Sequence, residues 1–112
     1  MRKQPSPEPV AVVIDSIERV EKGAGCYRRS LPAVGPVSAW VVDMDPGSEW
    51  PYVDHHDEMG EQVYIASGEL IEGERRYQAG QYIVFGPNSS HRPRTDTGVR
   101  LIGFNLLGRL LR

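Results

Sequence analysis

The chain has 112 residues, 39% hydrophobic and 25% charged, a balance typical of one globular domain rather than a disordered segment. Its formal net charge of −2 at pH 7 argues against a nucleic-acid partner, and no apolar run approaches the ~18 residues that span a bilayer. Cys26 is the only cysteine, which excludes an internal disulfide and a cluster of thiolate metal ligands.

The chain begins with a proline-rich segment in which Pro5, Pro7 and Pro9 alternate with other residues. No apolar stretch typical of a secretory signal follows its two basic residues, so we expect a cytoplasmic protein. Prolines at this density favour an extended chain. We therefore predict a flexible arm over residues 1–9 and one folded domain over residues 10–112.

Short runs rich in β-branched and aromatic residues follow, separated by Gly, Pro, Asn and Asp. Several of these runs are apolar on both alternating faces, which predicts a second layer or a subunit against the sheet. The apolar and basic tail, residues 106–112, is expected to pack as an edge strand or helical turn. Roughly eight strands of this kind predict a β-sandwich or small barrel. The predicted strands cover residues 10–14, 26–31, 37–44, 61–66, 69–72, 75–77, 81–85 and 99–106, with a hairpin at Gly73.

All three histidines fall in two short segments, residues 54–64 and 86–91. Imidazole is the commonest metal ligand, so this clustering indicates one metal site. On a strand, Asp54 and His56 share a face, while His55 points away unless a bulge intervenes. Glu61 follows a turn and is able to face back toward His56. No Lys or Arg occurs between residues 31 and 74, where ten of the fifteen acidic residues lie, and this charge attracts cations.

The spacing of these residues resembles the two sequence motifs of the cupin superfamily. His56, four residues, Glu61, six residues and Gly68 follow the first motif, and Gly80 and His91 follow the second, with Pro87 one place late. The resemblance extends to the metal-binding cupin domain of an anti-sigma factor family and to small polyketide-cyclase-type cupins. It implies an all-β, single-domain fold of the cupin type, a double-stranded β-helix or jelly-roll barrel.

The sequence departs from the first motif at its first histidine, where Asp54 stands with His55 beside it. Either Asp54 is an oxygen ligand, or a bulge brings His55 inward, or the metal has three protein ligands. We predict His55, His56, Glu61 and His91 as ligands, with Asp54 as the substitute for His55. The cofactor implied by the resemblance is a divalent ion, one of Zn, Fe, Mn, Ni or Co.

The resemblance implies a metal-dependent enzyme, of dioxygenase, isomerase or cyclase type, that acts on a small organic molecule inside the barrel. Tyr64 and Asp54 are the candidate catalytic residues for moving a proton, and Arg92 and Arg94 are candidates for binding a carboxylate or phosphate. A first alternative is a non-catalytic metal-binding ligand or stress sensor that regulates a partner protein. A second is a metabolite binder without metal. A homodimer with exchanged ends is expected.

Overall fold

The computed structural model describes residues 7–56 and 58–107. These residues form β-strands and one short 3-10 turn, η1 (Ile14–Ser16), which confirms the predicted all-β class. No helix in the described ranges is long and apolar enough to cross a membrane. The strands are β1 (Val20–Gly23), β2 (Cys26–Leu31), β3 (Val37–Met44), β4 (Asp54–His55), β5 (Glu61–Glu72), β6 (Arg75–Gln78), β7 (Tyr82–Phe85), β8 (Ser90–His91) and β9 (Val99–Leu106).

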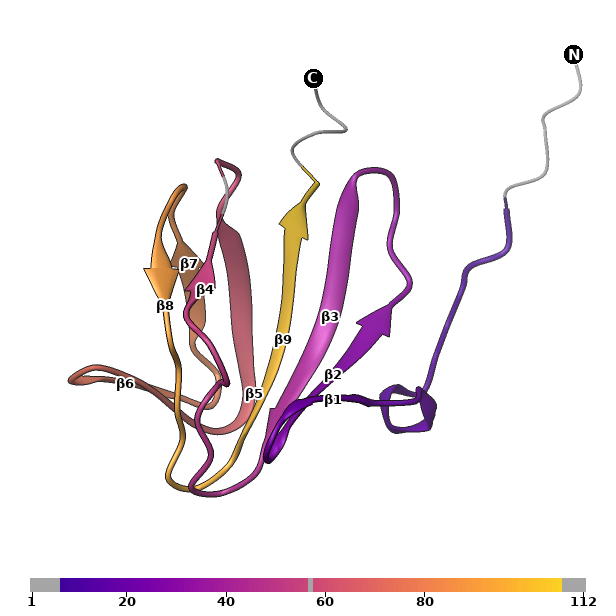
Figure 1. The fold of residues 1–112 in the computed structure, drawn as a ribbon. Helices are drawn as coiled ribbons and strands as arrows, with labels where there is room; N and C mark the ends of the chain where they lie inside the picture. The colour runs from indigo at the N-terminus through magenta and orange to yellow at the C-terminus, as the bar shows by residue number, and fades with distance from the viewer. Residues whose placement is uncertain (1–6, 57, 108–112) are drawn as a thin grey trace, which may run out of the picture.

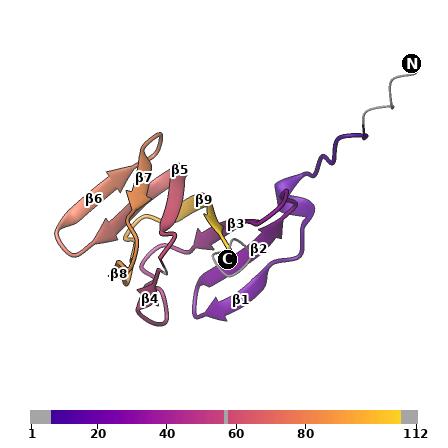
Figure 2. The same cartoon turned by 90° about the horizontal axis from the view of Figure 1, so that it is seen from above.

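The strands form a large antiparallel sheet in the order β1-β2-β3-β9-β5-β6, with β7 also paired to β5, and a separate pair, β4 and β8. The long strands β3, β9 and β5 lie side by side at the centre of the large sheet (Figure 1). Seen from above, this sheet bends, and β4 and β8 lie on its concave side (Figure 2). The concave side is therefore where side chains from distant segments meet.

The central strands follow the sequence prediction closely. The predicted strands at residues 37–44 and 99–106 are β3 and β9, which pair along eight residues from Val37–Leu106 to Met44–Val99. The predicted strands at 61–66 and 69–72 are one strand, β5, with a register shift between Ile65 and Ser67. This shift lets the first half of β5 pair with β7 and the second half with β6.

The first predicted strand, residues 10–14, is wrong, because no strand forms there and β1 begins only at Val20. Val10 and Val13 are 76% and 72% exposed. Branched residues favour a strand only where a neighbouring strand can pair with it, and this segment has none in the described chain. Residues 1–6 of the predicted arm and residues 108–112 of the predicted tail lie outside the described residues.

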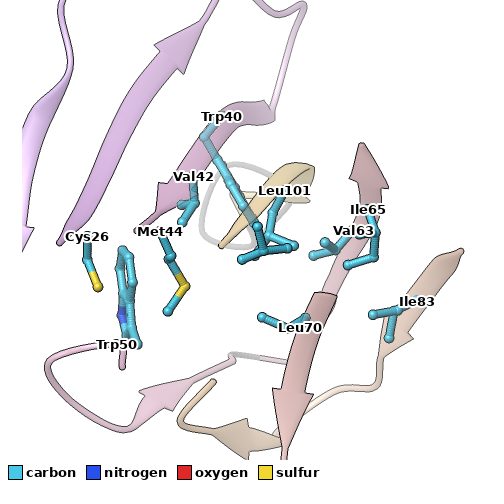
Figure 3. Packing of buried hydrophobic residues seen from close by; sticks show 11 residues of the cluster. Cys26, Trp40, Val42, Met44, Trp50, Val63, Ile65, Leu70, Ile83 and Leu101 are labelled. Carbon is cyan, nitrogen blue, oxygen red and sulfur yellow. The ribbon is translucent and has the colours of Figure 1, made fainter. Parts of the chain in front are cut away.

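Alternate side chains of β3, β5 and β9 fill the core on the concave side. Because Val63, Ile65 and Leu70 of β5 face the core, they pack against Trp40 and Leu101 of β3 and β9 (Figure 3). Each such buried side chain contributes about 1.5–3 kcal/mol. Cys26 is also fully buried, which raises the pKa of its thiol, and it donates to the Glu49 carbonyl at 3.3 Å. It is a core residue rather than a reactive thiol.

Gly68, the last residue of the first motif, occupies a close approach between β5 and β9. Its φ is +78°, and a Cβ placed on it would lie 1.9 Å from the Gly98 carbonyl oxygen. No other residue fits without moving β9. The motif glycine therefore keeps β5 and β9 paired beside the register shift.

Candidate metal site and cavity

The short pair of strands β4 and β8 determines which side chains meet. Asp54 pairs with His91, and His55 pairs with Ser90, without a bulge. Residues directly opposite on antiparallel strands point to the same side, so Asp54 and His91 face one another while His55 faces the other way. Just beyond β4, the His56 amide donates to the Ser89 carbonyl at 2.8 Å, which holds the two histidine-bearing segments together.

Four side chains converge at this point: Asp54, His56, Glu61 and His91. One donor atom from each lies within 4.8 Å of the others. The Nδ1 atom of His56 is 3.2 Å from Oε2 of Glu61, the first residue of β5. The rings of His56 and His91 have centroids 4.6 Å apart, and Phe85 stacks on His91 at 4.3 Å. The apolar ring therefore limits how the two imidazoles can move.

Two residues predicted for the site are not among the four converging side chains. His55 is exposed and does not belong to the converging group, because β4 continues in regular register and places Asp54 there instead. Tyr64 is 44% exposed on the outer face of β5, opposite Tyr82 and Ile102, while its neighbours Val63 and Ile65 face the core. The structure therefore does not place either side chain among the four that converge, and the roles of metal ligand for His55 and proton transfer for Tyr64 stay predictions.

Glu72 is a site residue that the sequence prediction missed. Its Oε1 atom lies 2.7 Å from Nδ1 of His91. The signal was present in the strand pattern, since Glu72 stands two residues after the buried Leu70 and so shares its inward face. A carboxylate on one imidazole nitrogen orients the ring and leaves the other nitrogen for a ligand. In His91 that other nitrogen is Nε2, which lies 3.5 Å from Oδ2 of Asp54.

The site perturbs the pKa values of its members in a consistent way. Burial raises the pKa of Glu61 to about 7, and the negative charge of Asp54 adds to this effect. Burial of His91 would lower the pKa of its imidazolium, but the Asp54 and Glu72 carboxylates outweigh it and raise the pKa to about 9. His91 in turn lowers the pKa of Asp54. Such a concentration of shifted groups in one place is typical of functional sites.

The donor set fits a divalent transition metal. Two imidazoles and two carboxylates are the ligands that Fe, Mn, Ni, Co and Zn accept, and two histidines with carboxylates suit ions that keep an open position. Neither buried ring nitrogen of His91 makes a hydrogen bond of good geometry with a described residue, although Nδ1 lies 2.7 Å from Glu72. Buried polar atoms of this kind are unusual, and they suit a ring that binds an ion. These residues could therefore hold a metal without rearrangement of the fold.

A cavity of about 400 Å³ opens onto the site. This volume is within the range of pockets for small organic ligands. Asp54, His56 and Glu61 form one part of its wall, and the ring of Trp50 meets Tyr52 edge-on at 5.8 Å in another part. Its other lining residues are Lys22, Arg28, Trp40, Val42, His55, Gly60 and Asn105.

Arg92 and Arg94, predicted to bind an anionic group, do not line this cavity. Arg92 donates to the Trp50 carbonyl at 2.8 Å and pairs with Glu49, and Arg94 pairs with Asp96. They are engaged by the protein itself, in keeping with the solvated role that short arginine pairs usually have.

The acidic central part of the sequence divides into two groups. Asp43 lies on the outer side of β3 and pairs with Arg29 and Arg100. Asp54, Glu61 and Glu72 instead gather around the histidines. The negative charge predicted near the histidines is therefore present, but only part of the acidic stretch supplies it.

No protein-family model matches the chain, and no curated protein matches it. Solved structures do. An RmlC-like cupin from Shewanella frigidimarina matches with a TM-score of 0.73 at 23% identity, over 91% of this chain and 94% of that one. The polyketide cyclase RemF from Streptomyces resistomycificus matches with a TM-score of 0.74 at 13% identity, over 89% and 80%.

A third match is a chain in the complex of Rhodobacter sphaeroides SigE with the anti-sigma ChrR. The TM-score is 0.73 at 17% identity, over 83% of this chain and 51% of that one. Identities this low establish the fold alone. The chain has the cupin fold, as its two histidine-bearing motifs predicted.

Proposed function

We propose that the protein is a metal-dependent enzyme that acts on a small organic molecule in the 400 Å³ cavity, by a reaction of dioxygenase, isomerase or cyclase type. The observation that carries this proposal is the convergence of Asp54, His56, Glu61 and His91, the first three of which line the cavity wall. A group of metal ligands that opens onto a ligand-sized cavity is more than a structural ion site needs.

Each residue of the site has a separate task in this proposal. His56, Glu61 and His91 would hold the ion together with Asp54, and the bound ion would polarise a substrate carbonyl or activate a water. Glu72 orients His91. Asp54 has the most exposed side chain of the four candidate ligands, at 36%. Its carboxylate is therefore the candidate group for transferring a proton to or from the substrate. Trp40 and Trp50 exclude water from one side of the cavity.

The test is the metal content of protein purified without a metal-binding tag. We expect close to one divalent ion per chain in the wild type, and loss of that ion in His56→Ala and His91→Ala. His55→Ala is the matched control, because this neighbouring histidine is exposed and lies outside the converging group. Turnover should then be found in a panel of enolisable and phenolic compounds.

Unchanged metal content in His56→Ala and His91→Ala would overturn the proposed site. Loss of metal in His55→Ala would show that β4 adopts the shifted register, with His55 inward.

A second candidate function is a metal-binding ligand or stress sensor that regulates a partner protein. The match to a chain of the SigE and anti-sigma ChrR complex favours it. The two candidates differ in turnover: a stoichiometric metal without activity on any compound of the panel would favour the sensor. In either case we propose a homodimer, which the exposed apolar face of the sheet supports.

A further inference from the structure

Arg28 points into the cavity and has no acidic partner. It lies on β2 two residues after the fully buried Cys26 and opposite the buried Val42, so it faces the concave side. Its Nη1 atom donates to Ser30 Oγ at 3.3 Å. Within residues 7–56 and 58–107, no carboxylate forms an ion pair with it.

The neighbouring Arg29 shows what an arginine on the other face of β2 does. Its Nη1 atom lies 2.5 Å from Asp43, on the convex side of the sheet. Arg76, Arg92 and Arg100 likewise have carboxylate partners. An arginine without such a partner is notable in a chain with more acidic than basic residues. Arg28 also lines the same cavity as two carboxylates and two histidines.

Two further donors lie beside Arg28 along the cavity. Lys22 stands at the register shift between Glu21 and Gly23, where β1 bulges against β2, and it also has no ion pair in the described chain. The Asn105 carbonyl oxygen accepts from the Trp40 indole at 3.3 Å, and its amide nitrogen donates no hydrogen bond to a described residue. All three side chains carry N–H donors, and none of these three nitrogen groups has an acidic acceptor.

The charges around the cavity do not balance without an anion. Asp54 and Glu61 would neutralise a divalent ion, and Glu72 would keep one negative charge beside a neutral, metal-bound His91, outside the lining of this cavity. Arg28 and Lys22 then exceed the remaining negative charge by one, and both positive charges lie at the cavity. Arg28 acts electrostatically on Glu61, so the guanidinium and the metal site face the same space.

We infer that the molecule bound in this cavity carries a carboxylate group, held by the Arg28 guanidinium with support from Lys22 and Asn105. The planar guanidinium matches a carboxylate through two parallel N–H donors. This inference deepens the proposed function, on which it rests, by giving the chemical class of the substrate. A reacting carbonyl on the same molecule would then lie toward Asp54, His56 and Glu61.

The test measures the binding of malonate by calorimetry to wild type and variants loaded with Zn²⁺. We expect Arg28→Gln to weaken malonate binding about tenfold or more, and Arg28→Lys to weaken it less because the charge remains. Arg75→Gln is the control, since Arg75 is exposed on β6 outside this cavity. Zn²⁺ should bind Arg28→Gln at least as tightly as wild type, because a nearby positive charge is gone.

The outcomes separate this inference from the proposed function. If wild type binds Zn²⁺ and malonate affinity is the same in Arg28→Gln, the carboxylate site is overturned and the metal site stands. An equal loss in Arg75→Gln also overturns it, because the effect is then only that of net charge. If wild type binds no Zn²⁺ but malonate binding still depends on Arg28, the metal proposal fails and the carboxylate site stands.

Discussion

His91 lies between two carboxylates that have different tasks. Glu72 is 2.7 Å from Nδ1, on the side away from the cavity, and Asp54 is 3.5 Å from Nε2, among the converging donor atoms. A carboxylate behind a metal-binding imidazole fixes its tautomer and makes its other nitrogen a better ligand. Glu72 is therefore expected to control metal affinity without touching the ion.

Replacing Glu72 with glutamine tests this role. We expect Glu72→Gln to lower the affinity for Zn²⁺ or Ni²⁺ by about 10- to 100-fold, because an amide orients the ring but supplies no negative charge. Glu74→Gln, an exposed position on the same hairpin, is the control and should bind as wild type does. Competition with a fluorescent chelator measures both. Equal affinity in the two variants would remove Glu72 from the site.

The shifted pKa values predict how the stability of the metal-free protein depends on pH. Folding raises the pKa of Glu61 from 4.5 to about 7 and that of His91 from 6.5 to about 9. Both groups hold protons more tightly when folded, so each contribution is complete below the unfolded pKa and is lost as pH rises through the folded one. With EDTA present, we expect the free energy of unfolding to fall between about pH 5 and pH 9.

A bound metal should reverse this trend. Ligands must lose their protons before they bind an ion, so metal affinity rises with pH over the same interval. Thermal unfolding at pH 5.5, 7 and 8.5, with EDTA or with Ni²⁺, should therefore show the largest metal stabilisation at pH 8.5. In His91→Ala the upper part of the dependence should disappear. Metal-free protein that gains stability toward pH 8.5 would contradict the assignment of these groups.

At the scale of the element, β5 connects the site to the rest of the fold. Its first residue, Glu61, is a candidate ligand, and its last residue, Glu72, lies against His91. The register shift after Ile65 lets one strand pair with β7, β9 and β6 in turn. Gly68 lies next to this shift, against the Gly98 carbonyl, so a change there should disturb both ends of the strand.

Gly68→Ala should destabilise the protein by about 3 kcal/mol or more, because the new Cβ meets backbone and the φ of +78° is strained for alanine. Gly73→Ala is the matched control. Its φ is +57°, but no atom lies within 4 Å of a Cβ there, so only the conformational term of ~1–2 kcal/mol applies. Urea denaturation measures both. Equal losses would mean that the contact with Gly98 does not limit residue 68.

The strands that the sequence predicted correctly are long enough for their own residues to show a β pattern. β3 and β9 were predicted to the residue because each is a run of eight residues rich in branched and aromatic side chains. β4 and β8 were missed because two residues carry no periodicity, and they decide whether Asp54 or His55 faces His91. Spacing along the chain predicted that His56, Glu61 and His91 lie together, and the structure brings these side chains to one place. The pairing of β4 with β8 adds Asp54 to them.

At the scale of the whole molecule, the outer face of the sheet is exposed over β5, β7 and β9 among the described residues. Four large apolar side chains lie on adjacent strands there, on the face opposite the core. Tyr64 and Tyr82 are directly opposite one another, and Gln62 lies between Val84 and Phe104. Tyr64 is 44% exposed, Tyr82 56%, Val84 63% and Phe104 39%. Contiguous apolar surface of this kind marks an interaction site.

The second feature without a partner is the segment before η1. Val10, Val12 and Val13 are exposed. The indigo segment before η1 runs away from the sheet (Figure 1). The branched residues that predicted a strand here would have a strand to pair with if a second copy supplied a sheet edge. The same arrangement in both copies gives a closed dimer, in which the apolar face and the extended segment are both covered.

We therefore predict a homodimer. A double variant should separate it into monomers without affecting the metal site. Tyr82→Lys with Val84→Lys places two charges on the exposed face, on β7 and away from Asp54 and His56. Light scattering at micromolar concentration should give a dimer for wild type and a monomer of 12.5 kDa for the double variant. Val34→Lys, at an exposed loop position, should remain a dimer.

Metal content should be the same in all three proteins, which distinguishes a lost interface from an unfolded chain. A wild-type monomer, or a double variant that still pairs, would show that this face is not the interface.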